Sequence, residues 1–434
     1  MYLFRARAAG ACSLILGLAL NSAIAQSQTV AVATASPMTL GQAVERALAA
    51  NPALRGFGFD LKAQDARIIG AGQRPATEAS MELENFLGSG DDRGLDSAEA
   101  TFRLSQVIEL GGKRNLRTAA GQAGRNVLTV EQQAAQLDVL AEVTRRFILI
   151  AAHQEQLELT RNATEVSRET VKDVERRVSA ARSPEAELLR AQAALATAEL
   201  DERSAEQQLE VARRQLAALW GEPDDRFGVI TADIYRLPEP VEFESLARRL
   251  DANPDFLRFT SEARLREAEV RLARSQRRPD LLVSGGVRRL EATNDQAFVL
   301  GVSVPLFSGR RAAPAIAEAT ARRDRLDVDR QVAVLRARTQ LFGLYQELRQ
   351  AIAETRTVQD TILPRLEKAL KQTAYAYERG RYSYLELVDA QRTWQEARRA
   401  LIESAERAQT LQVEIERLTG EPLANENNSN QERP

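Results

Sequence analysis

The sequence is poor in several residue types, and each shortage excludes a class of protein. It has one cysteine and one histidine, so a metal site built from several Cys and His ligands is not available. Its 59 basic side chains are balanced by 61 acidic ones, which excludes the strongly basic surface of a nucleic-acid-binding protein. No nucleophile–base pattern stands out, so we expect neither an enzyme nor a cofactor. With 14 prolines and 5% aromatic residues, the composition is typical of long helices.

The N-terminus has the features of an export signal. Arg5 and Arg7 precede an apolar stretch at residues 8–20, and Ala23-Ile24-Ala25 offers a small-residue cleavage site. We therefore predict a signal peptide over residues 1–25 and a polar linker over 26–37. After Gln26 no apolar run reaches the roughly 18 residues of a membrane-spanning helix, so the mature protein is expected to be exported without one.

The rest of the chain contains one long pattern twice. Leu219-Trp220-Gly221-Glu222-Pro223 corresponds to Leu418-Thr419-Gly420-Glu421-Pro422, and each motif ends a helix with small and apolar residues at coiled-coil spacing. The first seam is Leu188, Ala191, Leu195, Ala198, Glu202, Ala205, Leu209, Ala212, Leu216 and Leu219. The second is Leu387, Ala390, Trp394, Ala397, Leu401, Ser404, Ala408, Leu411, Ile415 and Leu418. The chain is therefore expected to be an internal duplication.

Each copy also contains two segments that alternate apolar and polar residues, which predicts a β-hairpin. In the first copy Ala79, Met81 and Leu83 share one face. In the second, Phe298, Leu300 and Val302 do so, although Gly285, Gly286 and Arg288 weaken the preceding strand. Long helical segments follow each hairpin, and the second has a predicted kink or break at Pro364.

These patterns predict the domain layout. The first repeat spans residues 38–220, with a β-hairpin at about 77–110 and helices at about 112–220. The second spans 243–420, with a hairpin at about 280–307 and helices at about 309–419. A connector covers 221–242, and the tail 421–434 is predicted to be disordered.

The strand count predicts an assembly. Open strand edges cannot face lipid, and the smallest transmembrane barrels have about eight strands, so four strands per chain are too few. Two chains would supply eight and three chains twelve. We expect a mainly α fold with a small β part: duplicated long α-helical hairpins form an α-barrel, and four strands per chain join a shared transmembrane β-barrel.

The chain is similar over nearly all its mature length to the TolC-type outer membrane efflux proteins, the exit ducts of Gram-negative tripartite pumps. The likeness rests on the duplication, the placement of both hairpins, and the segment 375–420 with its motif Tyr384-Leu385-Glu386-Leu387-Val388-Asp389-Ala390-Gln391-Arg392. It implies a homotrimer in outer membrane lipid with a 12-stranded barrel and a periplasmic α-barrel. It also implies two partners, a periplasmic adaptor (membrane fusion) protein and an inner-membrane RND-type transporter.

The resemblance also assigns residues. Acidic side chains ring the periplasmic entrance in this family, and the matching positions are Glu386 and Asp389, with Glu187 and Arg190 at the same register in the first copy. Arg190 beside carboxylates would form an ion-pair latch that holds the mouth closed. The helical turns are the expected adaptor-docking tips: Arg182, Ser183, Pro184, Arg379, Gly380 and Arg381.

The cargo and two further readings stay open. Ser105-Gln106-Val107-Ile108-Glu109-Leu110-Gly111-Gly112-Lys113-Arg114 resembles the CzcC-like branch, which implies export of divalent heavy-metal cations. A drug or organic-compound efflux duct and a type I secretion duct would share the fold. A periplasmic coiled-coil scaffold or adaptor without a pore is the remaining alternative, and it would not need the two hairpins.

Overall fold

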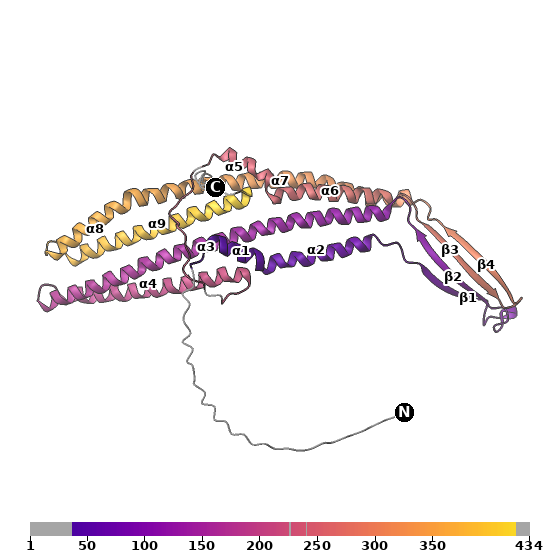
Figure 1. The fold of residues 1–434 in the computed structure, drawn as a ribbon, viewed down its shortest axis with the longest axis horizontal. Coiled ribbons are helices and arrows are strands. Elements are labelled where there is room, and N and C mark those ends of the chain that lie inside the picture. Colours follow the sequence, from indigo (N-terminus) through magenta and orange to yellow (C-terminus); the bar gives the residue numbers. More distant parts are fainter. Residues whose placement is uncertain (1–36, 225–226, 240, 422–434) are drawn as a thin grey trace, which may run out of the picture.

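The computed structural model describes residues 37–421 apart from 225–226 and 240. The predicted signal peptide, the linker up to residue 36 and the tail from residue 422 lie outside the described residues. The protein is a long rod, with a β-sheet at one end and the turns of two helical hairpins at the other (Figure 1). None of the described helices is both long and apolar enough to cross a membrane.

The helices repeat in the same order in both halves of the chain. The first half has α1 (Leu40–Ala50), α2 (Pro52–Ala71), α3 (Lys113–Ser179) and α4 (Glu185–Ala217). The second has α5 (Phe243–Arg249), α6 (Pro254–Ser275), α7 (Ser308–Thr357), α8 (Leu363–Glu378) and α9 (Tyr384–Thr419). At ~1.5 Å per residue, the 67 residues of α3 extend for about 100 Å.

The predicted seams are confirmed by burial, because every seam residue of α4 and α9 is at least partly buried. The predicted break near Pro364 is also confirmed. A π-helical turn, Val358–Ile362, separates α7 from α8 immediately before this proline. Proline removes one backbone donor and crowds the preceding turn, and the wider π turn accommodates both effects.

Each half of the chain is closed by a helix cap of the same kind. Asn51 caps the start of α2, and its amide Nδ2 donates to the carbonyl of Leu219 at 2.8 Å. Asn253 caps α6, and its Nδ2 donates to the carbonyls of Arg417 (2.7 Å) and Leu418 (3.0 Å). Each asparagine therefore satisfies backbone groups of two helix ends at once, the first N–H groups of one and the last carbonyls of the other.

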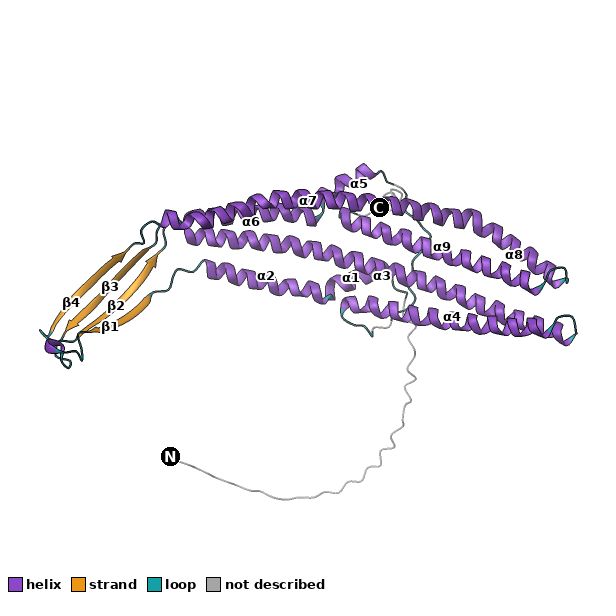
Figure 2. Ribbon diagram, turned by 180° about the vertical axis from the view of Figure 1, so that it is seen from behind, coloured by secondary structure: helices purple, strands orange, loops and turns teal. Residues whose placement is uncertain are grey.

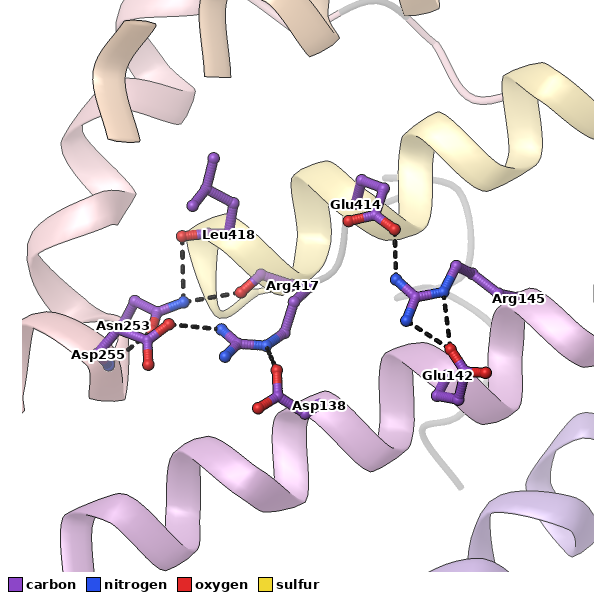
Figure 3. A network of polar contacts seen from close by, with 8 residues as sticks. All are labelled: Asp138, Glu142, Arg145, Asn253, Asp255, Glu414, Arg417 and Leu418. Atoms are coloured by element: carbon purple, nitrogen blue, oxygen red, sulfur yellow. Dashed lines mark hydrogen bonds and ion pairs between the residues drawn. The ribbon is translucent and has the colours of Figure 1, made fainter. Parts of the chain in front are cut away.

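A network of ion pairs connects the second half to α3 at the same level (Figure 3). The guanidinium of Arg417 lies between Asp138 of α3 and Asp255 of α6, and its Nη1 is 2.8 Å from Asp255 Oδ2. Arg145 of α3 pairs with Glu142 on its own helix and with Glu414 of α9. These contacts fix α3 against both helices of the other repeat at the middle of the rod.

The sheet contains β1 (Glu78–Glu84), β2 (Glu99–Ile108), β3 (Leu281–Leu290) and β4 (Asp295–Ser303), in that order, all antiparallel. The two hairpins therefore pair with each other through β2 and β3. Gly286 is required at this joint, since a Cβ there would lie 2.3 Å from the carbonyl oxygen of Phe102. The fold class expected from the sequence, mainly helical with four strands per chain, is confirmed.

Candidate functional site

The sheet has one apolar face, and it is open to solvent in the single chain. Met81, Phe102, Val287 and Phe298 form one cross-strand row, as the pairing register requires. On the edge strand β4, Phe298 is 88% exposed and Leu300 is 87% exposed. Monomeric soluble proteins rarely expose a continuous apolar surface of this kind, so this face is suited to lipid.

The opposite face is polar and carries paired charges. Arg288 of β3 lies 2.8 Å from Glu99 of β2 and 3.3 Å from Glu84 of β1. Its Nε also donates to the hydroxyl of Thr101, which is only 1% exposed. Arg288 weakens the strand pattern in the sequence because it belongs to this charged face. A sheet with one apolar and one charged face fits a wall between lipid and water.

The sheet is open at both edges. Within the described residues, β1 pairs only with β2, and β4 pairs only with β3. A strand edge presents unpaired N–H and C=O groups, which cannot remain unpaired in lipid. This face can therefore enter a membrane only after another strand joins each edge.

At the other end of the rod, the two hairpin turns have closely similar geometry. Ala181 and Gly380 both adopt the left-handed conformation, with φ of 56° and 70°. The following N–H groups, of Arg182 and Arg381, donate to carbonyls five residues earlier, at 2.8 and 2.9 Å. The predicted docking residues are exposed except the half-buried Ser183. The arginine of the second turn, Arg379, stacks over Tyr375 at 4.1 Å.

Next to the turns, the two hairpins are tied together. The guanidinium of Arg177 in α3 lies 4.1 Å from the ring centroid of Tyr377 in α8. Its Nη2 also donates to the carbonyls of Tyr377 (2.9 Å) and Glu378 (3.3 Å) at the end of α8. The apolar cluster around this contact consists of Val174, Ala191, Tyr377, Tyr384 and Leu387, which come from all four helices of the two hairpins. Sequence reasoning missed Arg177, because one arginine in the last turn of a helix is not distinctive.

The predicted entrance residues lie near this cluster. Glu187 and Arg190 of α4 lie close enough to Tyr384 to act on its phenol, whose pKa is raised mainly by burial. No carboxylate of a described residue lies within 4.0 Å of Arg190, so the expected ion pair is not formed within the single chain. Glu386 and Asp389 are exposed on α9.

Glu386 has a local role that sequence reasoning missed. Its carboxylate accepts from the N–H of Ser383 at 2.6 Å, and the Ser383 hydroxyl accepts from the N–H of Glu386, a reciprocal capping box that starts α9. The spacing Ser-x-x-Glu before an apolar seam is the signal that would have found it.

A groove of about 280 Å³ lies between the two hairpins, next to the apolar cluster around Tyr384. Small and polar residues line it, from α3 (Ala163, Ser167, Thr170), α4 (Ala194, Thr197, Asp201) and α9 (Gln391, Arg392, Gln395). Among the described residues, no group of three or more His, Cys, Asp or Glu is placed to hold a metal ion.

A comparison with protein families identifies a family that matches both repeats. The model described as "Outer membrane efflux protein" matches residues 43–222 and 246–421, one segment for each structural repeat.

Two curated relatives are similar over most of the chain. The cobalt-zinc-cadmium resistance protein CzcC of Cupriavidus metallidurans is 28% identical over 395 residues, which cover 88% of this chain and 93% of the relative. The nickel and cobalt resistance protein CnrC of the same species is 27% identical and covers 67% and 70%. Among solved structures, the outer membrane protein VceC from Vibrio cholerae superimposes with a TM-score of 0.69 at 19% identity, covering 89% of this chain and 97% of that one.

Proposed function

Because this chain belongs to the outer membrane efflux protein family, we propose that it forms, as a homotrimer, the exit duct of a tripartite efflux pump. In this proposal the sheets lie in the outer membrane and the helices extend into the periplasm. The observation that carries it is the sheet, which has an apolar face and two open edges. The family consists of channels, which are transporters rather than enzymes.

The order of elements across the chain supports a closed ring. Next to the sheet the helices are ordered α2, α3, α6, α7, so α2 and α7 lie at the edges, as β1 and β4 do in the sheet (Figure 2). If β4 of one copy pairs with β1 of the next, α7 is brought against α2 of the same neighbour. One head-to-tail interface then closes the β-barrel and the helical cylinder together, with four strands from each of three chains.

The exposed side of α7 supports this contact. Val328, Val332, Leu335 and Phe342 follow coiled-coil spacing and are all exposed. They point away from the buried positions Ala337 and Leu341. In the single chain Val328, Val332 and Leu335 form an outer stripe, which a second copy would cover. Phe342 continues this stripe, and its ring also packs edge-on against Phe243 of α5.

The substrate class proposed is divalent heavy-metal cations. The support is the similarity to the two metal-resistance proteins, together with the charge of the polar sheet face. Four carboxylates lie on that face of β1 and β2 (Glu78, Glu82, Glu84 and Glu99) against Arg103 and Arg288. If this face lines the barrel, the lumen would favour cations. Organic-compound efflux and type I secretion stay as alternatives for the same duct.

We further propose that the hairpin turns dock a periplasmic adaptor, and that an inner-membrane RND-type transporter supplies the energy. In the trimer, Glu386 and Asp389 would ring the periplasmic entrance, with Glu187 and Arg190 beside them. The contact of Arg177 with the end of α8 would hold the two hairpins together and keep that entrance narrow.

The test is direct. The full chain is purified from the membrane fraction in detergent, its mass is measured by light scattering, and its conductance is recorded in planar bilayers. Trimers that conduct are the expected result, whereas monomers that give no conductance would refute the duct.

Replacing Glu386 and Asp389 with alanine should change the block of this conductance by divalent cations, with Glu175→Ala on an exposed part of α3 as control. A deletion strain more sensitive to cobalt or zinc, but not to organic compounds, would support the metal assignment.

A further inference from the structure

The connections between the sheet and the helices carry a group of exposed arginines. The chain passes between the sheet and the helices four times, and each passage contributes at least one. The group, here called the arginine collar, consists of Arg74, Arg114, Arg277, Arg278, Arg310 and Arg311. All are exposed except Arg114, which is half-buried.

Nearby carboxylates do not neutralise the collar. Asp280 is taken by the buried Lys113, whose Nζ is 2.8 Å away, and it also accepts from the N–H of Leu110. Glu109 is taken by Arg117, with 3.0 Å between Nη2 and Oε2. Glu78, the remaining carboxylate at this level, starts β1 on the polar face. No collar arginine has a carboxylate of a described residue within 4.0 Å. The junction therefore has a strong excess of positive charge.

The collar begins where the apolar face of the sheet ends. Ile108, Val304, Leu306 and Phe307 are exposed apolar residues at the helix side of the strands. A cavity of about 490 Å³ opens at this level, lined by Arg74 and Arg114 and by the apolar Val107 and Ile108. Arg278 lies across Gly111, where a Cβ would come within 2.9 Å of its Cδ.

We propose that the arginine collar binds the phosphate groups of anionic phospholipids in the periplasmic leaflet of the outer membrane. The inference rests on the proposed function, which places the apolar sheet face in that membrane. An arginine at the edge of an apolar band reaches the headgroup level with its guanidinium, and its two-pronged donor geometry fits phosphate oxygens. The collar fixes the depth of the sheet in the bilayer.

The variant to test is Arg277→Gln/Arg278→Gln/Arg310→Gln/Arg311→Gln in the full chain. Its matched control is Arg203→Gln/Arg248→Gln/Arg356→Gln/Arg365→Gln, which removes four exposed arginines that also lack an ion pair but lie on helices away from the sheet. Native mass spectrometry of the detergent-solubilised proteins measures binding of phosphatidylglycerol, phosphatidylcholine and inorganic phosphate.

Wild type and control should retain phosphatidylglycerol in preference to phosphatidylcholine. The collar variant should lose on the order of several hundredfold in affinity for phosphatidylglycerol, since each of the four arginines removed contributes about fivefold near an anionic surface. Equal retention by the collar variant would overturn the proposal, and so would inorganic phosphate that competes at the same concentration as the lipid. Conductance in phosphatidylcholine bilayers tests the duct separately, because pores there do not require the anionic lipid.

Discussion

At the scale of single residues, both repeats contain the same asparagine cap, and the second repeat adds ion pairs beside it. Asn51 and Asn253 occupy the same place in the two repeats, before a proline that starts a helix. Only the second repeat surrounds its asparagine with the ion pairs of Arg417, because Asp255 and Arg417 correspond to Ala53 and Ala218 in the first. Arg417 also connects the second joint to Asp138 of α3 through an ion pair.

Asn253→Ala is expected to lower the free energy of unfolding by about 2–4 kcal/mol, because it leaves two carbonyls and one N–H without partners in a fully buried site. Asn51→Ala, which frees one carbonyl and two N–H groups in a buried site, should lower the free energy of unfolding by a similar amount. Thermal unfolding in detergent, followed by circular dichroism, measures both. A loss of less than about 1 kcal/mol for either variant would contradict the role assigned to its asparagine.

Glu406 of α9 gives a prediction about pH. Burial, and then the like charge of Glu403, raise the pKa of its carboxyl above the ordinary value of 4.5. A raised pKa means that its contribution to stability is complete below pH 4.5 and is lost as the pH rises through the folded-state value. Glu406→Gln should therefore raise the melting temperature at pH 7 and have little effect below pH 4.5.

Glu406 and His153 line one cavity between α3 and α9, and their pKa values shift in opposite directions, so the effect of Glu406 is measured as a difference between variants. Burial lowers the pKa of the His153 imidazole below 6.5, so its contribution is lost as the pH falls. Glu175→Gln, on an exposed part of α3, serves as the control. A Glu406→Gln variant that is no more stable than wild type at pH 7 would contradict the proposed cost of burying the charged carboxylate of Glu406.

At the scale of elements, the strands were predictable because their alternation follows the pleat, and the seams because coiled-coil spacing is long and regular. Gly286 and Arg288 obscured β3, since one permits a close backbone approach and the other pairs with Glu99 across the sheet. Both effects depend on the neighbouring strand β2, so they cannot be predicted from the sequence of β3 alone. Arg177 was missed for the same reason: its partners are backbone carbonyls of α8, far along the chain.

Two adjacent residues of β4 test the assignment of the sheet faces. Phe298 lies on the apolar face and Ala297 on the polar face. Phe298→Arg should cost about 2–4 kcal/mol near the bilayer midplane and reduce the amount of protein recovered in the membrane fraction. Ala297→Arg should be tolerated, because the arginine would face water and the carboxylates of the polar face. Fractionation and immunoblotting measure both, and similar losses for the two variants would reverse the assignment.

At the scale of the whole molecule, the two exposed sides of the protomer, one formed by β1 and α2 and the other by β4 and α7, should determine how copies assemble. Leu335 of α7 is 69% exposed at the centre of the outer stripe. Leu335→Asp places a charge where a second copy is expected to pack, and it should shift the detergent-solubilised protein from trimers toward monomers without changing its helix content. Gln340→Asp, on another side of the same helix, is the matched control. Trimers of unchanged stability for Leu335→Asp would show that the stripe is not a subunit contact.

The pairing of β2 with β3 has a consequence for biogenesis. All of α3 to α6 lies between these two strands in the sequence, so β2 cannot pair with β3 until more than half of the chain has been synthesised. Strands that are far apart in the sequence pair late in folding, and strands with unpaired backbone groups are prone to aggregate before then. If the chain is exported as proposed, we expect its folding to depend on a chaperone that covers β1 and β2 until β3 is available.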